Sequence, residues 1–129
     1  MYEFNLAIDL PFDQALEAVR NALAAEQFGI VSDLDVQTIF KAKIGKEIPA
    51  YRILGACNPA LADRVIAAEP NAGALLPCNL VIRAQGPAQT VVSVMDPVAV
   101  LGLSSAPELK AVAVEARARL ERAVGRLRA

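Results

Sequence analysis

The sequence predicts a small α+β protein, a two-layer sandwich in which two long helices cover a five-stranded, mainly antiparallel sheet. Segments of alternating polar and apolar residues indicate half-buried strands. Two segments with apolar residues three and four positions apart indicate long amphipathic helices. The connection between the last two strands is too short for a crossover, so that pair must be antiparallel. The expected order is strand, helix, four strands and helix, with short helical inserts.

The chain of 129 residues is long enough for one domain, residues 1–129, with a core of its own. The hydrophobic fraction of 55% includes a surplus of alanine, so large apolar side chains are fewer than this fraction suggests. No linker or low-complexity segment divides the sequence. We therefore expect a single domain that needs no disulfide to fold.

The first strand and helix follow from the pattern at the N-terminus. Residues 2–8 alternate between apolar and polar side chains, which predicts a strand. Pro11 opens a helix over residues 12–28. We expect Gly29 to end this helix in the left-handed conformation. The apolar stripe of the helix contains Leu16, Val19 and Leu23, with Phe12 at its start.

Two strands and a short helix are expected next. Residues 30–37 alternate again and predict the second strand, with Asp33 and Asp35 on its water-facing side. Residues 38–45 predict a short helix that a glycine ends. Residues 51–56 predict a third, more apolar strand.

A capping device occurs twice in the second half of the sequence. Asn58 precedes Pro59, and Asp96 precedes Pro97. An N-cap residue followed by proline at the first helical position is typical of a helix start. The sequence therefore predicts a helix over residues 59–68 and a helical turn after Asp96.

The remaining elements form a hairpin and a final helix. Residues 78–83 and 90–95 predict the fourth and fifth strands. Residues 107–127 predict the final helix, whose arginines we expect on a solvated face. Its apolar stripe consists of Leu109, Val112, Ala113, Ala116, Leu120, Ala123, Val124 and Leu127.

Cys57 and Cys78 are the residues best suited to chemistry, because the sequence contains no histidine. This absence excludes Ser-His-Asp and Cys-His nucleophile pairs and imidazole metal ligands. Cys57 ends the third strand at the mouth of a predicted helix, where the helix dipole favours a thiolate, and Cys78 begins the fourth strand. If the two strands are antiparallel neighbours the thiols come close, whereas in a parallel pair a strand length separates them.

Several kinds of thiol site remain open. Both cysteines can be reduced core residues, which is common for free cysteine. They can also form a two-coordinate Cu(I) site, half of a thiolate site completed across a dimer, or a reversible disulfide. Zinc would need two further ligands. Asn58, Asn79 and Asp96 complete the candidate ligand-binding set; Asn58 and Asp96 are also explained as N-caps, but Asn79 has no such local explanation.

Three functions therefore compete. The first is a binding or sensing module that holds a soft metal or a redox ligand between Cys57 and Cys78. The second is an enzyme with Cys57 as nucleophile, in which Lys43 or the helix dipole stabilises the thiolate and Asn79 or backbone amides stabilise an oxyanion. The third is a structural homodimer in which an open sheet edge or the apolar segment 98–103 makes the contact.

Composition excludes several partners and indicates a compartment. The net charge of −1 gives no electrostatic case for nucleic-acid binding. The most apolar segment, residues 91–103, is too short for a membrane span and contains Asp96 and Pro97. The N-terminus has no export signal, so we expect a cytoplasmic protein with reduced thiols.

Several segments resemble the family called domain of unknown function 302. They are Asp-Val-Gln-Thr at 35–38, Tyr-Arg-Ile-Leu-Gly-Ala-Cys-Asn-Pro at 51–59, Leu-Leu-Pro-Cys-Asn at 75–79 and Met-Asp-Pro at 95–97. The resemblance implies a fold of the TATA-box-binding-protein class with the third and fourth strands antiparallel, which would bring Cys57 and Cys78 together. It also implies a cytoplasmic homodimer of no assigned activity. Such a fold does not imply DNA binding, because functions are grafted on folds.

Overall fold

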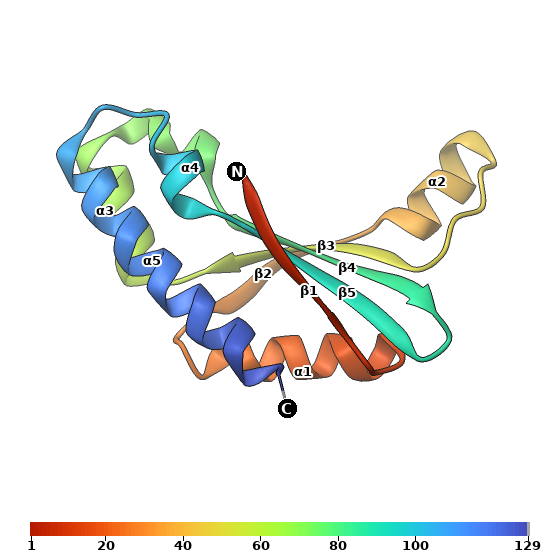
Figure 1. Cartoon of the computed structure of the whole chain (residues 1–129). Helices are drawn as coiled ribbons and strands as arrows, with labels where there is room; N and C mark the ends of the chain where they lie inside the picture. Colours follow the sequence, from red (N-terminus) through yellow and green to blue (C-terminus); the bar gives the residue numbers. More distant parts are fainter. Residues whose placement is uncertain (129) are drawn as a thin grey trace.

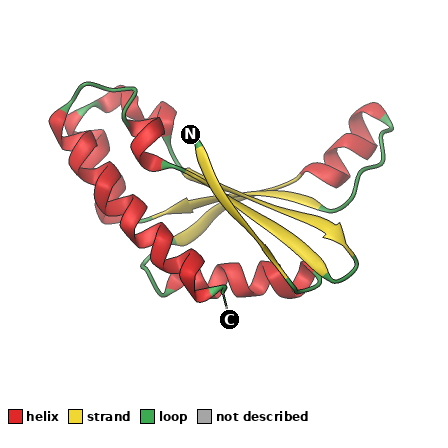
Figure 2. Ribbon diagram, viewed as in Figure 1, coloured by secondary structure: helices red, strands yellow, loops and turns green. Residues whose placement is uncertain are grey.

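The computed structural model describes residues 1–128 and contains one five-stranded sheet in the order β1-β5-β4-β3-β2 (Figures 1 and 2). Every neighbouring pair of strands is antiparallel, so the expected α+β fold class is confirmed. The elements are β1 Glu3–Ile8, α1 Phe12–Ala24, β2 Gly29–Asp35, α2 Val36–Ile44, β3 Tyr51–Cys57, α3 Pro59–Ala68, the 3-10 helix η1 Pro70–Leu75, β4 Cys78–Gly86, β5 Gln89–Met95, α4 Pro97–Leu101 and α5 Pro107–Arg126.

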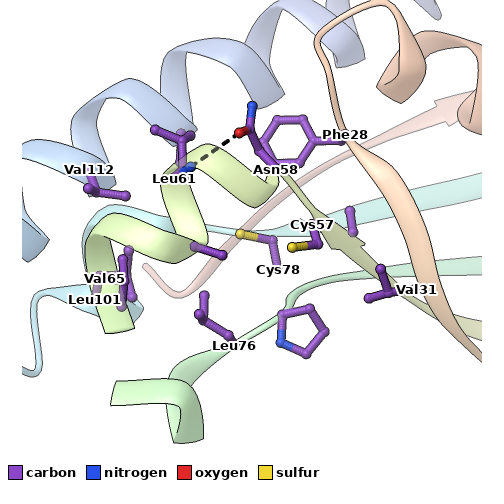
Figure 3. Close-up of a pocket in the computed structure, with 14 residues that line it drawn as sticks. Phe28, Val31, Cys57, Asn58, Leu61, Val65, Leu76, Cys78, Leu101 and Val112 are labelled. Atoms are coloured by element: carbon purple, nitrogen blue, oxygen red, sulfur yellow. Dashed lines mark hydrogen bonds between the residues drawn. The ribbon is translucent and has the colours of Figure 1, made fainter. Parts of the chain in front are cut away.

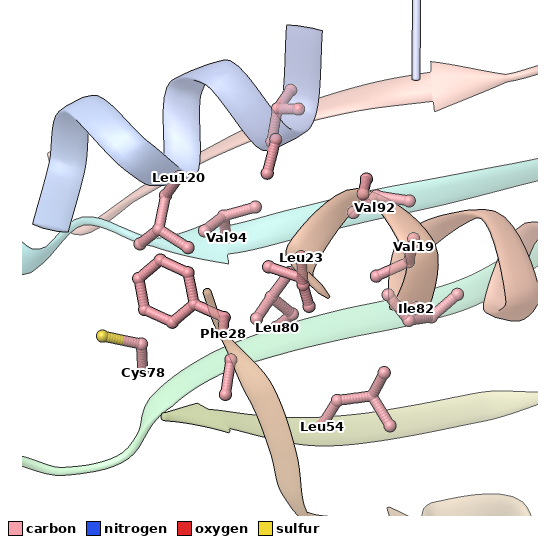
Figure 4. Close-up of a cluster of buried hydrophobic side chains, with 14 of the residues drawn as sticks. Val19, Leu23, Phe28, Leu54, Cys78, Leu80, Ile82, Val92, Val94 and Leu120 are labelled. Carbon is pink, nitrogen blue, oxygen red and sulfur yellow. The ribbon is translucent and has the colours of Figure 1, made fainter. Parts of the chain in front are cut away.

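One face of the sheet packs against α1 and α5 and forms the main core (Figure 4). Because side chains alternate across a strand, every second residue of β3, β4 and β5 points to these helices. The largest fully buried side chains of the sheet are Leu54, Leu80, Ile82, Val92 and Val94. Seven of the eight residues predicted for the stripe of α5 are buried, and the eighth, Leu127, is half-buried. A second apolar cluster lies where α3, η1 and α4 meet the first half of α5.

The end of α1 differs from the prediction. The helix stops at Ala24, and Gln27 rather than Gly29 takes the left-handed conformation, with φ 62°. The amide of Phe28 donates to the carbonyl of Leu23 at 3.0 Å. This turn places the Phe28 ring in the core, and Gly29 then starts β2. Burial of Phe28 accounts for the early turn, since a continued helix would carry its ring past the core.

Glu26 fastens the turn after α1 to the last helix. Its buried carboxylate accepts hydrogen bonds from Arg122 at 2.9 Å and from Arg126 at 3.0 Å. Arg126 and Arg122 hold the pKa of the Glu26 carboxyl below its usual value by donating these bonds. The prediction that the arginines of α5 form only a solvated face is therefore incomplete. Arg122 and Arg126 connect α5 to the turn after α1 through Glu26.

The segment around α2 also differs in detail. The helix begins at Val36, two residues early, because the Asp35 side chain accepts a hydrogen bond from the Thr38 amide at 3.1 Å. Asp33 is exposed, as predicted, and it accepts hydrogen bonds from Arg20 at 3.1 Å and from Arg52 at 2.8 Å. These contacts explain the two aspartates as structural residues.

The remaining differences concern short segments. The η1 helix was not predicted, since proline and glycine in this stretch indicated only a break. β4 extends to Gly86 and β5 begins at Gln89, so the hairpin loop is tighter than expected. The predicted bounds of the helix at residues 59–68 and the capping of α4 by Asp96 are confirmed. Among residues 1–128, no helix is long and apolar enough to cross a membrane.

Candidate functional site

The antiparallel pairing of β3 with β4 brings the two cysteines to one end of the sheet. Ala56 is paired with Cys78, so Cys57 at the end of β3 lies beside the start of β4. Both sulfur atoms lie within one pocket (Figure 3). Both cysteines are free thiols. A shared thiol site required that β3 and β4 be antiparallel neighbours, and the sheet topology meets this condition.

The pocket that the thiols share is small and apolar. Its volume is about 80 Å³, and its walls come from the strand ends, α3, the segment after η1, and α5. Such a volume holds a metal ion or a ligand of a few heavy atoms, whereas sites for drug-sized ligands measure roughly 300–1,000 Å³. The main apolar wall residues are Phe28, Val31, Leu61, Val65, Leu76 and Leu101.

The two thiols differ in environment. Cys78 is buried, and Cys57 is partly accessible to solvent. Burial in the apolar pocket raises the pKa of the Cys78 thiol to about 11, and the neighbouring Cys57 contributes to the same direction. Cys78 is therefore a protonated thiol near neutral pH. Cys57 is the thiol that a reagent from solvent meets first.

Asn58 lies beside the thiols but has a structural role. Its buried side chain accepts a hydrogen bond from the Leu61 amide at 3.2 Å, which caps α3 as predicted. Asn58 also lines the pocket. The side-chain oxygen of Asn58 is therefore occupied by the capping bond. Asn58 directly follows Cys57, where the chain passes from β3 into α3.

The other proposed ligands are not part of this pocket. Asn79 is exposed, and because side chains alternate along β4 it points away from the face that carries Cys78. Asp96 is buried at the start of α4, where it accepts from the Val98 amide at 2.9 Å and from the Arg117 guanidinium. Lys43 lies on α2, next to the opposite end of β3 from Cys57 (Figure 1). The structure therefore brings together only Cys57, Asn58 and Cys78.

Asp96 is a structural connector, so its removal should affect stability. We expect Asp96→Ala to lower the free energy of unfolding by about 2 kcal/mol, because the variant loses a helix cap and a hydrogen bond from a charged group. Urea unfolding measures this change. Asp13→Ala, an exposed first-turn residue of α1 without a capping bond, is the control and should change stability by less than about 0.5 kcal/mol. Equal losses in both variants would contradict the connector role.

The pocket walls contain residues that sequence patterns did not single out. Gly55 on β3 lies close to Pro77, which directly precedes β4. A Cβ atom at position 55 would be 2.6 Å from Cγ of Pro77. Val31 and Leu76 form the wall nearest solvent. A usable signal was present, because each cysteine directly follows an apolar residue or a proline and has another one two positions after it. Residues 1–128 contain no group of three or more His, Cys, Asp or Glu side chains placed to hold a metal ion.

The fold and the site define a class of small α+β protein, with a five-stranded antiparallel sheet, helices on one face and a thiol pocket at the end of the sheet. A model of the family "Domain of unknown function DUF302" matches residues 4–127, and the chain belongs to this family. A crystal structure of an uncharacterised conserved DUF302 protein from Bacillus stearothermophilus is similar, with a TM-score of 0.88, 26% identity and coverage of 98% of each chain. No curated protein matches the chain.

Proposed function

We propose that the protein is a binding or sensing module for a soft, thiophilic metal ion, with Cu(I) as its ligand at Cys57 and Cys78. One observation carries this proposal: two free thiols from neighbouring antiparallel strands share a small apolar pocket. Thiolates are the ligands that Cu(I) prefers, and two of them suffice for a soft monovalent ion. An apolar wall limits access of water to such an ion.

The other ligands considered for the thiols are less well supported. Zinc takes four ligands, and the described part of the chain has no third cysteine, histidine or carboxylate at the pocket. A volume of about 80 Å³ is too small for an organic redox cofactor. The enzyme alternative lacks the two side-chain partners proposed for Cys57, because Lys43 and Asn79 lie elsewhere, and it retains only the N-terminus of α3 beside this thiol. A soft metal ion is the ligand that needs nothing beyond the two thiols.

Proton release accompanies binding at such a site. Metal binding requires thiolates, and burial keeps the pKa of Cys78 at about 11. Binding of Cu(I) releases one proton from Cys78. Below about pH 11, the observed Cu(I) affinity should therefore increase about tenfold for each rise of one pH unit. The site also needs reduced thiols, which favours a reducing compartment such as the cytoplasm.

A competition titration tests the proposal. Reduced protein, purified without a metal-affinity tag, is titrated anaerobically with Cu(I) held by a chromogenic chelator. We expect one Cu(I) per chain. Cys57→Ser and Cys78→Ser should each weaken binding by more than about 100-fold, since loss of even an outer-shell partner of a metal commonly costs about 10- to 100-fold.

Val31→Ala is the matched control, because it changes the exposed wall of the pocket and keeps both thiols. This variant should bind Cu(I) with the stoichiometry of the unmodified protein. Unchanged Cu(I) affinity in the Cys57→Ser/Cys78→Ser double variant would refute the proposal. Affinity that does not vary with pH would contradict the proton release from Cys78.

A further inference from the structure

The backbone around the two pocket thiols has the spacing that a disulfide needs. Cys78 pairs across the sheet with Ala56, so Cys57 is its diagonal neighbour. Paired Cα atoms of antiparallel strands lie about 5 Å apart and a strand advances about 3.4 Å per residue, which places the Cα atoms of Cys57 and Cys78 roughly 6 Å from each other. Disulfides span Cα separations of roughly 4.4–6.8 Å. A cross-link is therefore compatible with the observed pairing of β3 and β4.

The two cysteine side chains also share one space. Side chains alternate along a strand, but β3 ends at Cys57, and the pocket at this end of the sheet takes in both cysteines. Figure 3 shows the two sulfur atoms inside this pocket, close to α3. The sequence contains no other cysteine that could compete for either thiol. Each thiol is thus the nearest disulfide partner of the other.

The two thiols have unequal access to a reagent. Cys57 is partly accessible to solvent, whereas Cys78 is 6% exposed. The pocket has apolar walls and a volume of about 80 Å³, so a small oxidant such as hydrogen peroxide fits, whereas a peptide disulfide does not. Redox-sensitive cysteines are typically accessible and lie next to a second, resolving cysteine. This arrangement makes Cys57 the thiol that is oxidised first and Cys78 the resolving thiol.

We propose that Cys57 and Cys78 form a reversible disulfide in response to hydrogen peroxide, and that this bond prevents Cu(I) from binding. Formation of the disulfide depends on the placement of the thiols alone, whereas its effect on Cu(I) rests on the proposed function. Cu(I) needs thiolate ligands, and a disulfide supplies none. The protein therefore releases the metal under oxidising conditions and binds it again after reduction.

The reaction balances with peroxide as the only oxidant. The Cys57 thiolate attacks one peroxide oxygen, the O–O bond breaks, and the departing hydroxide takes up the thiol proton to become water. Cys57 is then a sulfenic acid. The sulfur of Cys78 gives up its proton and attacks the sulfur of Cys57, the S–O bond breaks, and a second water leaves. Two thiols and one peroxide thus give one disulfide and two waters, because both sulfur atoms are oxidised and both peroxide oxygens are reduced.

The disulfide also encloses the part of the chain that forms α3 and η1, which lies between the two cysteines in sequence. A cross-link that closes a loop of about 20 residues stabilises the folded state mainly by restricting the unfolded chain. The oxidised protein should therefore have a midpoint of thermal unfolding roughly 10 °C above that of the reduced protein. Scanning calorimetry of the two forms measures this shift. A lower midpoint for the oxidised form would mean that the cross-link distorts the fold, and it would contradict the proposed placement of the thiols.

Peroxide treatment of the reduced, metal-free protein tests the disulfide itself. Hydrogen peroxide is added in the presence of a chelator, and intact mass, free thiols and migration on a non-reducing gel are measured. We expect a cross-link within one chain, with loss of both thiols and of the mass of two hydrogen atoms, and recovery of both thiols with a dithiol. Cys78→Ser should stop at a sulfenic acid on Cys57, which dimedone traps. Cys57→Ser should keep Cys78 as a free thiol under the same treatment.

A Cu(I) titration of the oxidised and reduced forms separates the two proposals. Oxidation should weaken Cu(I) binding by more than about 100-fold, and the dithiol should restore it. A disulfide in a protein whose reduced form does not bind Cu(I) would refute the copper site and leave the thiol pair standing. Two surviving thiols in a protein that binds Cu(I) would overturn the disulfide. Cross-links between chains, or a sulfinic acid on Cys57 in place of the disulfide, would overturn it as well.

Discussion

Cys78 is expected to react with a small alkylating reagent about 100-fold more slowly near neutral pH than a thiol of ordinary pKa, in addition to any steric hindrance. The thiolate is the reactive form, and burial raises the pKa of Cys78 from 9.0 to about 11. Below that value the rate should rise about tenfold per pH unit, and it should level off only near pH 11. The pH profile of alkylation in a Cys57→Ser variant, followed by mass spectrometry, measures this.

The same experiment separates the two causes of the shift. Desolvation is the larger cause and the charge of Cys57 the smaller, so removing Cys57 should leave most of the elevation of the Cys78 pKa in place. The Cys78→Ser variant reports on Cys57 alone and gives the alkylation rate of the more accessible thiol for comparison. A Cys78 rate that levels off near pH 9 would mean that water reaches the pocket.

Gly55→Ala is expected to lower the free energy of unfolding by about 1–3 kcal/mol, the usual cost of overpacking. A Cβ atom at this position would lie 2.1 Å from Oγ of Ser32 and 2.6 Å from Cγ of Pro77. The serine hydroxyl can rotate away, but the proline ring is part of the backbone and must shift as a unit. Because Pro77 lines the pocket next to Cys78, the variant should also weaken Cu(I) binding.

Gly29→Ala provides a closely matched control. Gly29 lies on the neighbouring strand and pairs with Cys57, and a Cβ atom there would meet nothing within 4 Å. Its stability should change by less than about 0.5 kcal/mol. Chemical unfolding and Cu(I) titration of both variants make the comparison. If Gly55→Ala is as stable as Gly29→Ala, the close approach of Pro77 to β3 does not constrain the pocket.

Local patterns predicted most of the fold because they report local physics. The stripe of α5 follows from helical spacing, and the caps at Asn58 and Asp96 follow from the chemistry of helix N-termini. The end of α1 was predicted poorly, because burial of Phe28 by distant parts of the chain decides where the helix stops. The role of Glu26 was missed for the same reason, since its partners lie about a hundred residues away in sequence.

The candidate site shows the same division. Sequence spacing placed Cys57 at the end of a strand before a helix and Cys78 at the start of another strand, and both placements are confirmed. It could not show that Asn79 points away from the pocket, since the face of a residue has meaning only once the helices cover one side of the sheet. The apolar walls from Val31, Leu76 and Leu101 come from separate elements that meet only in the folded chain.

The sequence by itself determined the types of the elements, their order, the absence of histidine chemistry and the choice of cysteine as the reactive side chain. The tertiary structure alone decided that β3 and β4 are neighbours, that the two thiols share a pocket, and that no residue of α2 is buried. The physical reason is the distance along the sequence over which each interaction acts. Helix and strand periodicity, capping and turns depend on residues a few positions apart, whereas strand pairing and burial depend on contacts between segments far apart in sequence.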